Sequence, residues 1–261
     1  MKKKITLHLI QLATQAGQPL RTLKNFQAWL TRLRIRRDDV LVFPELWASG
    51  FSLEDRDRLI RENALCLAWL REFSRQEHCY MVGSMLEMDK RRVYNQAYLV
   101  DPRGRSLATY RKIHLFEYGG EHRHFRPGRK VVATPSPWGK LGLAICYDLR
   151  FPELFRSLSK QGARLVFVPS AWPRERRDHF LTLLKARAIE NQCFMVGLNK
   201  VGPGLHEKPV VYGGHSAVFG PWGERLAEMG ARGGILSLSL DLPEVERIRD
   251  RYPFLKSRVL G

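Results

Sequence analysis

Short, continuous apolar runs alternate along this chain with longer amphipathic stretches. Residues 40–43, 141–145 and 194–198 are apolar throughout, as expected of strands covered on both faces. Other stretches repeat apolar residues at three- and four-residue steps, from Leu20 to Leu33 for example, which predicts helices with one buried face. This alternation predicts a mixed α/β fold in which helices cover the outside of the sheets.

The same patterns predict the remaining elements. Further strands are expected at residues 5–13, 80–86, 91–100, 106–110, 164–169, 215–219 and 234–241. Further helices are expected at residues 52–78, 174–192 and in the tail 243–260. Residues 115–137 and 201–214 are irregular and contain several glycines, so loops are expected there. No linker or repeat divides the chain, which predicts a single domain over residues 1–261.

The composition excludes several classes of protein. With 261 residues, 44% of them hydrophobic, the chain can bury one substantial core. No apolar run approaches the length of a membrane-spanning helix, and Thr6, His8 and Gln11 interrupt the apolar stretch near the N-terminus. We therefore expect neither a membrane span nor a signal peptide, and predict a cytoplasmic protein.

The cysteines are too far apart for a shared metal or redox motif. None of them forms a C-x-x-C pair, so neither zinc binding nor a disulfide framework is expected. The four positions are Cys66, Cys79, Cys146 and Cys193.

The formal net charge of +18 raises the question of an anionic partner. A basic surface can bind nucleic acid, an anionic membrane or an acidic substrate. However, the chain contains no recognised nucleic-acid-binding motif, and its arginines are scattered in ones and twos. We expect solvated helix faces, with no nucleic-acid and no membrane partner. A basic binding protein remains the alternative outside enzymes.

Cys146 stands where a predicted strand ends and a predicted helix is about to begin. Pro152, which suits the first turn of a helix, follows the polar turn after Cys146. Backbone N–H groups and the positive end of a helix dipole gather at such a position and favour a thiolate. Cys146 is therefore a candidate nucleophile, and a buried structural cysteine is the alternative.

A thiol that attacks an acyl group needs a base and a donor for the developing oxyanion. Glu45 directly follows the strand at 40–43, where burial would raise its pKa toward the range of a general base. Lys112 follows the strand at 106–110 and could face an oxyanion. The alternatives are a turn glutamate and a surface lysine. Both residues share with Cys146 a position at the carboxyl end of a strand, where active-site groups collect.

Histidine is the usual base for a cysteine nucleophile, so a Cys–His pair stays open. Several histidines lie in or near predicted loops, but none follows an apolar strand directly. These are His114, His122, His124, His206 and His215.

Three segments together resemble the signatures of the nitrilase, or carbon–nitrogen hydrolase, superfamily. They are FPELWASGF around Glu45, YRKIHLF around Lys112 and ICYDLRFPELFR around Cys146, in the order of that superfamily. KARAIENQCFMVGLNKVG and GHSAVFGPWGE, nearer the end of the chain, are also similar to it. The resemblance covers essentially the whole chain. It implies a four-layer α-β-β-α sandwich, two copies of which pair through their outer helices as a homodimer.

The resemblance also implies roles for individual residues. Cys146 would be the nucleophile, and Glu45 would be the general base and then the acid. Lys112 would steady the tetrahedral intermediate, with the backbone N–H of Tyr147 as a second oxyanion donor. Glu121, within YGGEHRHFRPG, matches a glutamate that orients the substrate amide. The resemblance implies no metal and no cofactor.

The residues after the nucleophile indicate a branch of the superfamily. CYDLRFP resembles the ω-amidases and the amidases acting on deaminated glutathione, and PSAWPRERRDHF, with Trp172, is similar to bacterial ω-amidases. This predicts hydrolysis of the side-chain amide of a small dicarboxylic monoamide, such as 2-oxoglutaramate or succinamate, through a cysteine thioester. Trp172 would line the pocket, and Arg174, Arg176 or Arg177 would bind the distal carboxylate. A deaminated-glutathione amidase, a carbamoylase and a nitrilase remain alternatives.

Overall fold

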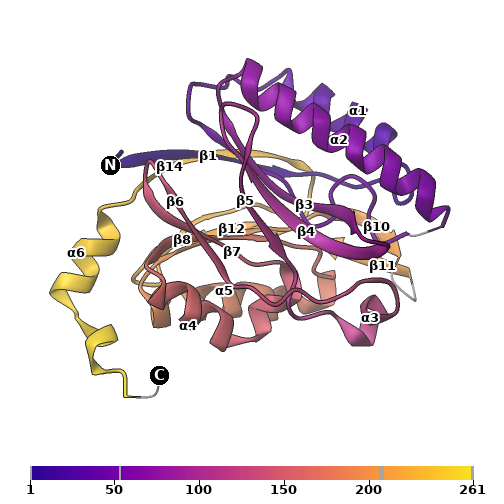
Figure 1. The fold of residues 1–261 in the computed structure, drawn as a ribbon. Coiled ribbons are helices and arrows are strands. Elements are labelled where there is room, and N and C mark those ends of the chain that lie inside the picture. The colour runs from indigo at the N-terminus through magenta and orange to yellow at the C-terminus, as the bar shows by residue number, and fades with distance from the viewer. Residues whose placement is uncertain (1, 53, 206–208, 260–261) are drawn as a thin grey trace.

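Two six-stranded mixed sheets face each other, and helices cover the outer face of each sheet (Figure 1). The computed structural model describes residues 2–52, 54–205 and 209–259. The first sheet has the order β14 (Gly234–Asp241), β1 (Lys4–Gln11), β2 (Val40–Val42), β3 (Tyr80–Asp89), β4 (Arg92–Val100), β5 (Ser106–Arg111). The second has the order β13 (Arg225–Glu228), β12 (Ala217–Phe219), β9 (Phe194–Leu198), β8 (Ala163–Pro169), β7 (Gly139–Leu143), β6 (Val132–Ser136).

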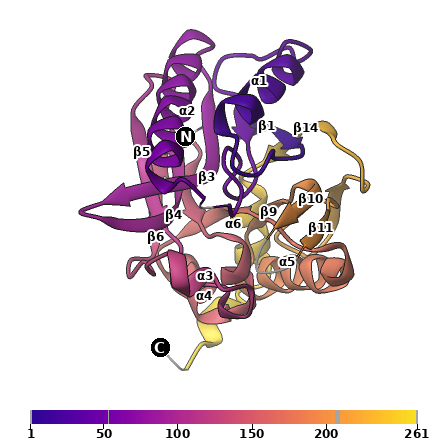
Figure 2. The same ribbon diagram turned by 90° about the vertical axis from the view of Figure 1, so that its right-hand side faces the viewer.

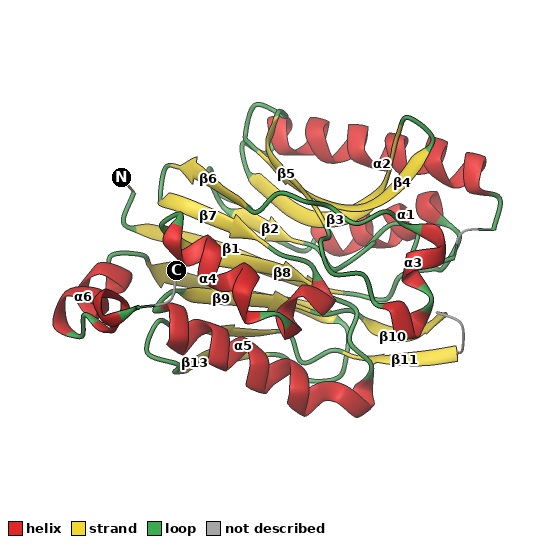
Figure 3. Cartoon of the chain, turned by 60° about the horizontal axis from the view of Figure 1, so that its bottom comes forward, coloured by secondary structure: helices red, strands yellow, loops and turns green. Residues whose placement is uncertain are grey.

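The helices form the two outer layers. On the first sheet lie α1 (Pro19–Leu30) and α2 (Arg56–Gln76), which pack side by side (Figure 2). On the second sheet lie α4 (Pro152–Lys160) and α5 (Arg177–Asn191). The short α3 (Glu121–His124) lies near the open edge of the sandwich, and α6 (Glu244–Arg251) extends to one side (Figure 3). The predicted four-layer α-β-β-α sandwich is therefore confirmed.

The apolar run that forms β2 is explained by its burial on both faces. Val40 and Val42 belong to the core between the two sheets. Leu41 and Phe43 point the other way, into the core under α1, where Phe43 stacks on Phe26 with ring centroids 5.6 Å apart. Alternate residues of one strand thus fill two different cores, so no polar residue interrupts the run.

The strand directions bring five strand ends to one edge of the sandwich. β1, β2 and β3 are parallel, as are β7, β8 and β9. β5 runs in the direction of β3, because each of them pairs antiparallel with β4. The segments after β2 and β5 therefore leave the first sheet at one end, and those after β7, β8 and β9 leave the second sheet at one end. These two ends meet, since the Glu45 N–H after β2 donates to the Ser170 carbonyl oxygen after β8 at 3.4 Å, and the candidate site lies there.

Two predicted loops contain strands. Within 201–214, β10 (Val201–Leu205) and β11 (Pro209–Gly213) form an antiparallel hairpin. A Cβ atom at Gly204 would lie 2.1 Å from the Tyr212 ring, so this glycine makes room for a cross-strand aromatic rather than ending the strand. Within 115–137, β6 is an edge strand on β7 that tolerates Pro135. The loop prediction was therefore wrong for β10, β11 and β6, and the segment 115–137 also contains α3, whereas its remaining described residues are largely irregular as predicted.

The other predicted elements are present with shifted ends. β13 was not predicted, and the helix expected at 174–192 begins with a 3-10 turn, Arg174–Arg176, before α5. The tail predicted at 243–260 contains α6 and a 3-10 turn, Phe254–Ser257. Leu260 lies outside the described residues. No helix in the described ranges is long and apolar enough to cross a membrane.

Candidate active site

Glu45 sits in the turn after β2, fully buried. The turn is held by Leu46, whose backbone has a φ of 41° and donates its N–H to Ser84 Oγ at 2.9 Å. Glu45 Oε1 accepts hydrogen bonds from Lys112 Nζ and from Asn95 Nδ2, both at 2.8 Å. The other oxygen, Oε2, has no hydrogen-bond partner among the described residues. The carboxylate is therefore fixed through one oxygen and open at the other.

Lys112, after β5, joins two carboxylates. Its Nζ lies 2.8 Å from Glu45 Oε1, and 2.9 and 2.8 Å from the two oxygens of Glu121. Burial by itself lowers the pKa of Lys112, but Glu121 and Glu45 outweigh it and hold that pKa above its ordinary value. Lys112 is therefore a permanent ammonium in this setting.

Glu121 begins α3 and is buried. Its Oε2 accepts the backbone N–H of Phe116 at 2.6 Å, and its Oε1 lies 3.3 Å from Asn95 Nδ2. Because Asn95 also donates to Glu45, one amide group of β4 bridges the two carboxylates. Glu45, Lys112 and Glu121, all predicted from the sequence, thus form one buried hydrogen-bonded cluster.

Cys146 occupies a sharp elbow between β7 and α4. Its φ is +47°, in the left-handed region that non-glycine residues rarely adopt. Residues Cys146–Arg150 form a 3-10 turn, and Pro152 then starts α4. The buried Asp148 holds the elbow by accepting hydrogen bonds from the Ile145 N–H at 2.9 Å and from the Tyr110 hydroxyl at 2.7 Å. The predicted strand–turn–helix arrangement at Cys146 is confirmed.

The thiol of Cys146 keeps its proton in this structure. Burial raises the pKa of Cys146 well above its ordinary value, and the Glu45 carboxylate raises it further. Lys112 and a hydrogen bond from the backbone of Ala171 oppose that increase without cancelling it. Nucleophilic attack by this sulfur therefore needs a base, and the free oxygen of Glu45 is the candidate.

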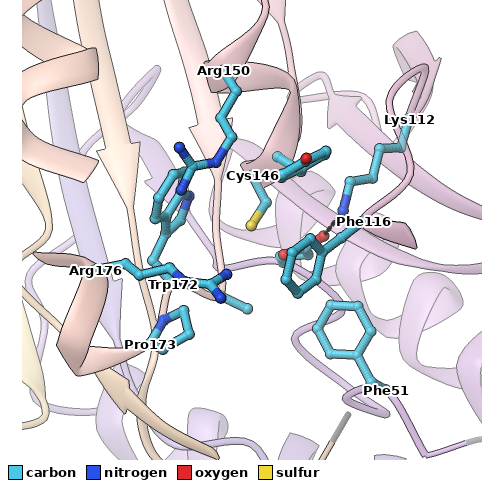
Figure 4. Close-up of a pocket in the computed structure, with 11 residues that line it drawn as sticks. Phe51, Lys112, Phe116, Cys146, Arg150, Trp172, Pro173 and Arg176 are labelled. Atoms are coloured by element: carbon cyan, nitrogen blue, oxygen red, sulfur yellow. Dashed lines mark hydrogen bonds and ion pairs between the residues drawn. The ribbon is translucent and has the colours of Figure 1, made fainter. Parts of the chain in front are cut away.

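Cys146 and the cluster open into a narrow pocket of about 20 Å³ (Figure 4). A buried water occupies roughly 10–15 Å³ on this measure, so the pocket accepts about one small group. The lining residues are Glu45, Phe51, Lys112, Phe116, Cys146, Tyr147, Arg150, Ala171, Trp172, Pro173 and Arg176.

The pocket includes two guanidinium groups. Arg150 lies over the Trp172 ring, with Cζ 4.7 Å from its centroid, and Arg176 lies 5.3 Å from the Phe116 ring (Figure 4). Of the three arginines predicted to face the substrate, only Arg176 lines the pocket. Arg177 instead pairs with Glu228 at 3.1 Å, and Arg174 is exposed outside the pocket lining.

Comparison with known proteins places this geometry in a family. The model of the carbon–nitrogen hydrolase family matches residues 9–250. The chain belongs to the carbon–nitrogen hydrolase family. It is 34% identical over 252 residues to a 2-oxoglutaramate amidase of Bacillus subtilis, covering 96% of each chain. It is also 38% identical over 178 residues to a deaminated glutathione amidase of Synechocystis, covering 64% of this chain and 65% of that protein.

The fold of this carbon–nitrogen hydrolase agrees with solved structures. A CN-hydrolase superfamily protein from Xanthomonas campestris superimposes with a TM-score of 0.89 at 28% identity, covering 99% of both chains. The predicted membership of the nitrilase superfamily, in an ω-amidase-like branch, is therefore confirmed, and so is the nitrilase-type sandwich.

No described histidine lines the Cys146 pocket of this hydrolase, so the structure does not support a Cys–His pair. His114 accompanies Asp148, with 2.8 Å between Nδ1 and Oδ1, and stacks on Phe151 outside the pocket lining. His206 lies outside the described residues. In the part of the chain that the structure describes, no group of three His, Cys, Asp or Glu side chains could hold a metal ion.

Three residues of the carbon–nitrogen hydrolase site were not singled out from the sequence. Asn95 is a polar residue within a largely apolar strand, and Asp148 is an acid two residues after the nucleophile. Arg150 looked like one more scattered arginine, because its position over Trp172 depends on tertiary packing. The first two carried a usable signal, since a buried polar side chain needs hydrogen-bond partners.

Proposed function

We propose that this chain is an amidase that hydrolyses the terminal amide of a small dicarboxylic monoamide, of the 2-oxoglutaramate or succinamate type. One observation carries the proposal: Glu45, fixed through one oxygen and open at the other, lines the same pocket as the protonated Cys146. The similarity to a 2-oxoglutaramate amidase over nearly the whole chain supports this class of substrate.

In the first half of the reaction, Glu45 accepts the thiol proton and Cys146 Sγ attacks the amide carbon. The carbonyl oxygen becomes an oxyanion. Glu45 then passes its proton to the amide nitrogen, the C–N bond breaks, and ammonia leaves. A thioester between the acyl group and Cys146 remains.

In the second half, Glu45 takes a proton from water, and the resulting hydroxide attacks the thioester carbon. The C–S bond breaks, the acid is released, and the proton returns to Cys146. One amide and one water thus give one acid and one ammonia, with Glu45 and Cys146 restored. A single carboxylate serves as base and acid in turn, which its one open oxygen allows.

Lys112 and the backbone N–H of Tyr147 are the proposed donors to the oxyanion. Lys112 makes two of its three hydrogen bonds to the same carboxylate, that of Glu121. It can therefore release one of these to the oxyanion and stay bound to Glu121 through the other. Glu121 would keep the ammonium in place throughout and could also accept a hydrogen bond from the substrate amide.

The distal carboxylate of the substrate would bind to Arg150 and Arg176. Both guanidiniums line the pocket, and neither pairs with a carboxylate among the described residues; Arg150 Nη2 lies 3.2 Å from His179 Nδ1. Guanidinium groups pair bidentately with carboxylates, so they favour substrates that carry a second acid over simple amides.

Deaminated glutathione is the second candidate substrate, because the similarity to a deaminated glutathione amidase is higher in identity although it covers less of the chain. That substrate also carries carboxylates, but it is longer. The match to the 2-oxoglutaramate amidase, which covers 96% of each chain, favours the shorter acids.

The test measures ammonia release from 2-oxoglutaramate, succinamate and deaminated glutathione, alongside glutamine, a simple nitrile and an N-carbamoyl amino acid. We expect the first two to be the best substrates by kcat/KM. Preference for another of these compounds would change the proposed substrate but leave the proposed active site unchanged. Inactivity on all six compounds, together with binding to nucleic acid, would favour a basic binding protein.

The nucleophile is tested by Cys146→Ala, which should reduce turnover by at least about 10⁴-fold because every later step passes through the thioester. Cys66→Ala is the matched control, since it removes a buried thiol of α2 outside the pocket lining. Turnover of Cys146→Ala near the wild-type rate would rule out the proposed mechanism.

A further inference from the structure

Lys200 is a buried cation to which the mechanism above gives no role. It lies two residues after the end of β9 and is fully buried. Its Nζ has no hydrogen-bond partner among the described residues. A buried ammonium without such partners destabilises a fold, and lysines are almost never fully buried unless paired. The chain therefore carries a cost at this position that calls for a reason.

The neighbouring Asn199 ties Lys200 to the wall of the active-site pocket. Asn199 Oδ1 accepts the backbone N–H of Trp172 at 2.7 Å and that of Lys200 at 3.0 Å. Asn199 Nδ2 donates to the carbonyl oxygen of Trp172 at 3.1 Å. Since Trp172 lines the pocket, the backbone of Lys200 is fixed immediately behind that wall.

The side chain of Lys200 ends between two aromatic rings. Its Nζ lies 5.5 Å from the centroid of the Phe51 ring and 5.0 Å from that of Tyr212. Phe51 lines the pocket together with Glu45 and Cys146, so the ammonium contacts a ring that belongs to the pocket wall. The ring faces stabilise the cation in part but supply no countercharge.

The countercharge lies in the catalytic cluster. Glu45 and Glu121 are two buried carboxylates, whereas Lys112 is a single ammonium, so the cluster carries one excess negative charge. Attack by Cys146 places further negative charge on sulfur and then on the substrate oxygen. In a site of low polarity a second ammonium within electrostatic reach would offset that charge.

We propose that Lys200 is a positioning residue, whose ammonium balances the buried charge of Glu45 and Glu121 and so favours the negative charge that forms at Cys146 during attack. The inference rests on the proposed function, in which Cys146 is the nucleophile. Lys200 is not among the residues that line the pocket, so in this proposal it acts through its electrostatic field and not by contact with the substrate.

The compensation of the carboxylate charges by Lys200 depends on pH, because Lys200 can lose its proton. The charged and titratable groups placed around Lys200 are Glu45 after β2, Cys146 after β7 and Tyr212 on β11. Burial raises the pKa of Tyr212 and of Cys146, so both remain protonated at neutral pH. Burial lowers the pKa of Lys200 to about 8, although Glu45 and Cys146 oppose this. Of these protonated groups, Lys200 is therefore the first to lose its proton as the pH rises.

The experiment compares the wild type with Lys200→Met, Lys200→Arg and the control Lys24→Met, which removes an exposed lysine of α1. Two rates are measured from neutral to alkaline pH at constant ionic strength. One is the alkylation of Cys146 by iodoacetamide, which needs no substrate, with Cys146→Ala as the blank because the other cysteines are buried. The other is kcat/KM for succinamate.

At pH 7 we expect Lys200→Met to be about tenfold slower than the wild type in both rates, a change that corresponds to about 1.4 kcal/mol. The ratio of the wild-type rate to the Lys200→Met rate should approach one well above pH 8, where Lys200 is neutral in the wild type as well. Lys200→Arg, which stays charged, should keep its rates where the wild type declines. Lys24→Met should match the wild type throughout.

Equal rates for Lys200→Met and the wild type at pH 7 would overturn the inference. So would a ratio that does not change with pH, because that indicates a structural role. If Lys200→Met fails to fold, the test rests on Lys200→Arg. In that case the inference is overturned if the rates of Lys200→Arg at alkaline pH are no higher than those of the wild type. If the alkylation ratios behave as expected but no amide is hydrolysed, Lys200 keeps its role and the proposed function fails instead.

Discussion

At the scale of single residues, the site depends on how carboxylates share donors. Lys112 gives one hydrogen bond to Glu45 and two to Glu121, and Asn95 reaches both carboxylates. Removing the charge of Glu121 would leave Lys112 to pair with Glu45 alone. That pairing would hold the base more tightly and move the ammonium away from the oxyanion.

Glu121→Gln should therefore lower kcat/KM by about 100-fold, the usual effect of disturbing one oxyanion donor. The protein should stay folded, since glutamine has the same shape and can still accept the Phe116 N–H. Steady-state kinetics and circular dichroism check this, with the exposed neighbour Glu117→Gln as the control. Wild-type kinetics for Glu121→Gln would contradict the arrangement proposed for Lys112.

Lys200 also affects the stability of the fold, because its pKa differs between the folded and unfolded states. In the unfolded chain its pKa is the ordinary 10.5, whereas burial lowers it to about 8 in the folded protein. Between those values the unfolded state binds more protons, so this group's contribution to the free energy of unfolding rises with pH. The destabilisation of the folded state by Lys200 is complete below pH 8 and disappears as the pH approaches 10.5.

Lys200→Met should accordingly be more stable than the wild type below pH 8, by up to about 3 kcal/mol. The difference should shrink as the pH rises toward 10.5. Urea denaturation at several pH values measures it, with Lys24→Met as the control. A variant less stable than the wild type at pH 7 would show that the lysine stabilises the fold instead.

At the scale of elements, the β7–α4 elbow depends on Asp148. This buried carboxylate accepts hydrogen bonds from Ile145, Tyr110 and the backbone of His114, and so fixes the segments on both sides of the nucleophile. Burial raises the pKa of the Tyr110 hydroxyl, and Asp148 raises it further, so the phenol stays protonated and keeps donating.

Asp148→Ala should lower the free energy of unfolding by about 3 kcal/mol, because it leaves several buried donors unpaired. It should also reduce activity, since Cys146 loses the support for its unusual φ. Denaturant unfolding and kinetics check both effects, and the exposed Asp250→Ala of α6 is the control. Unchanged stability would contradict this account of the elbow.

The secondary-structure elements also show how much of the fold could be predicted from the sequence. Strands buried on both faces could be predicted, because burial leaves a continuous apolar run such as that of β2. The β10–β11 hairpin could not, since Gly204 is there to accommodate Tyr212 from the facing strand, a contact that forms only once the two strands have paired. Glu45, Lys112 and Cys146 could be predicted from their places at strand ends. Lys200 also directly follows an apolar strand and its Asn199, so the same reasoning could have found it.

At the scale of the whole molecule, the superfamily resemblance predicts a homodimer that pairs through the outer helices. The layer formed by α4 and α5 carries the exposed Ile189, next to Gly223. We expect the chain to be a dimer in solution by light scattering. Ile189→Glu should yield a monomer, whereas Leu20→Glu, a similar change on the opposite helix layer, should not. A monomeric wild type would contradict the prediction.

The narrowness of the pocket has a consequence for selectivity by shape. With room for about one water-sized group beside Cys146, we expect the pocket to favour an amide that enters end-on, as the tip of an unbranched chain. We expect a methyl substituent on the carbon next to the carbonyl to be disfavoured, because Phe51, Phe116 and Trp172 contribute to the pocket wall. Asparagine and glutamine side chains within folded proteins could not bring their amides so deep. If the proposed function holds, we expect steric access to favour free small amides over the side-chain amides of folded proteins, independently of any charge at the far end of the substrate.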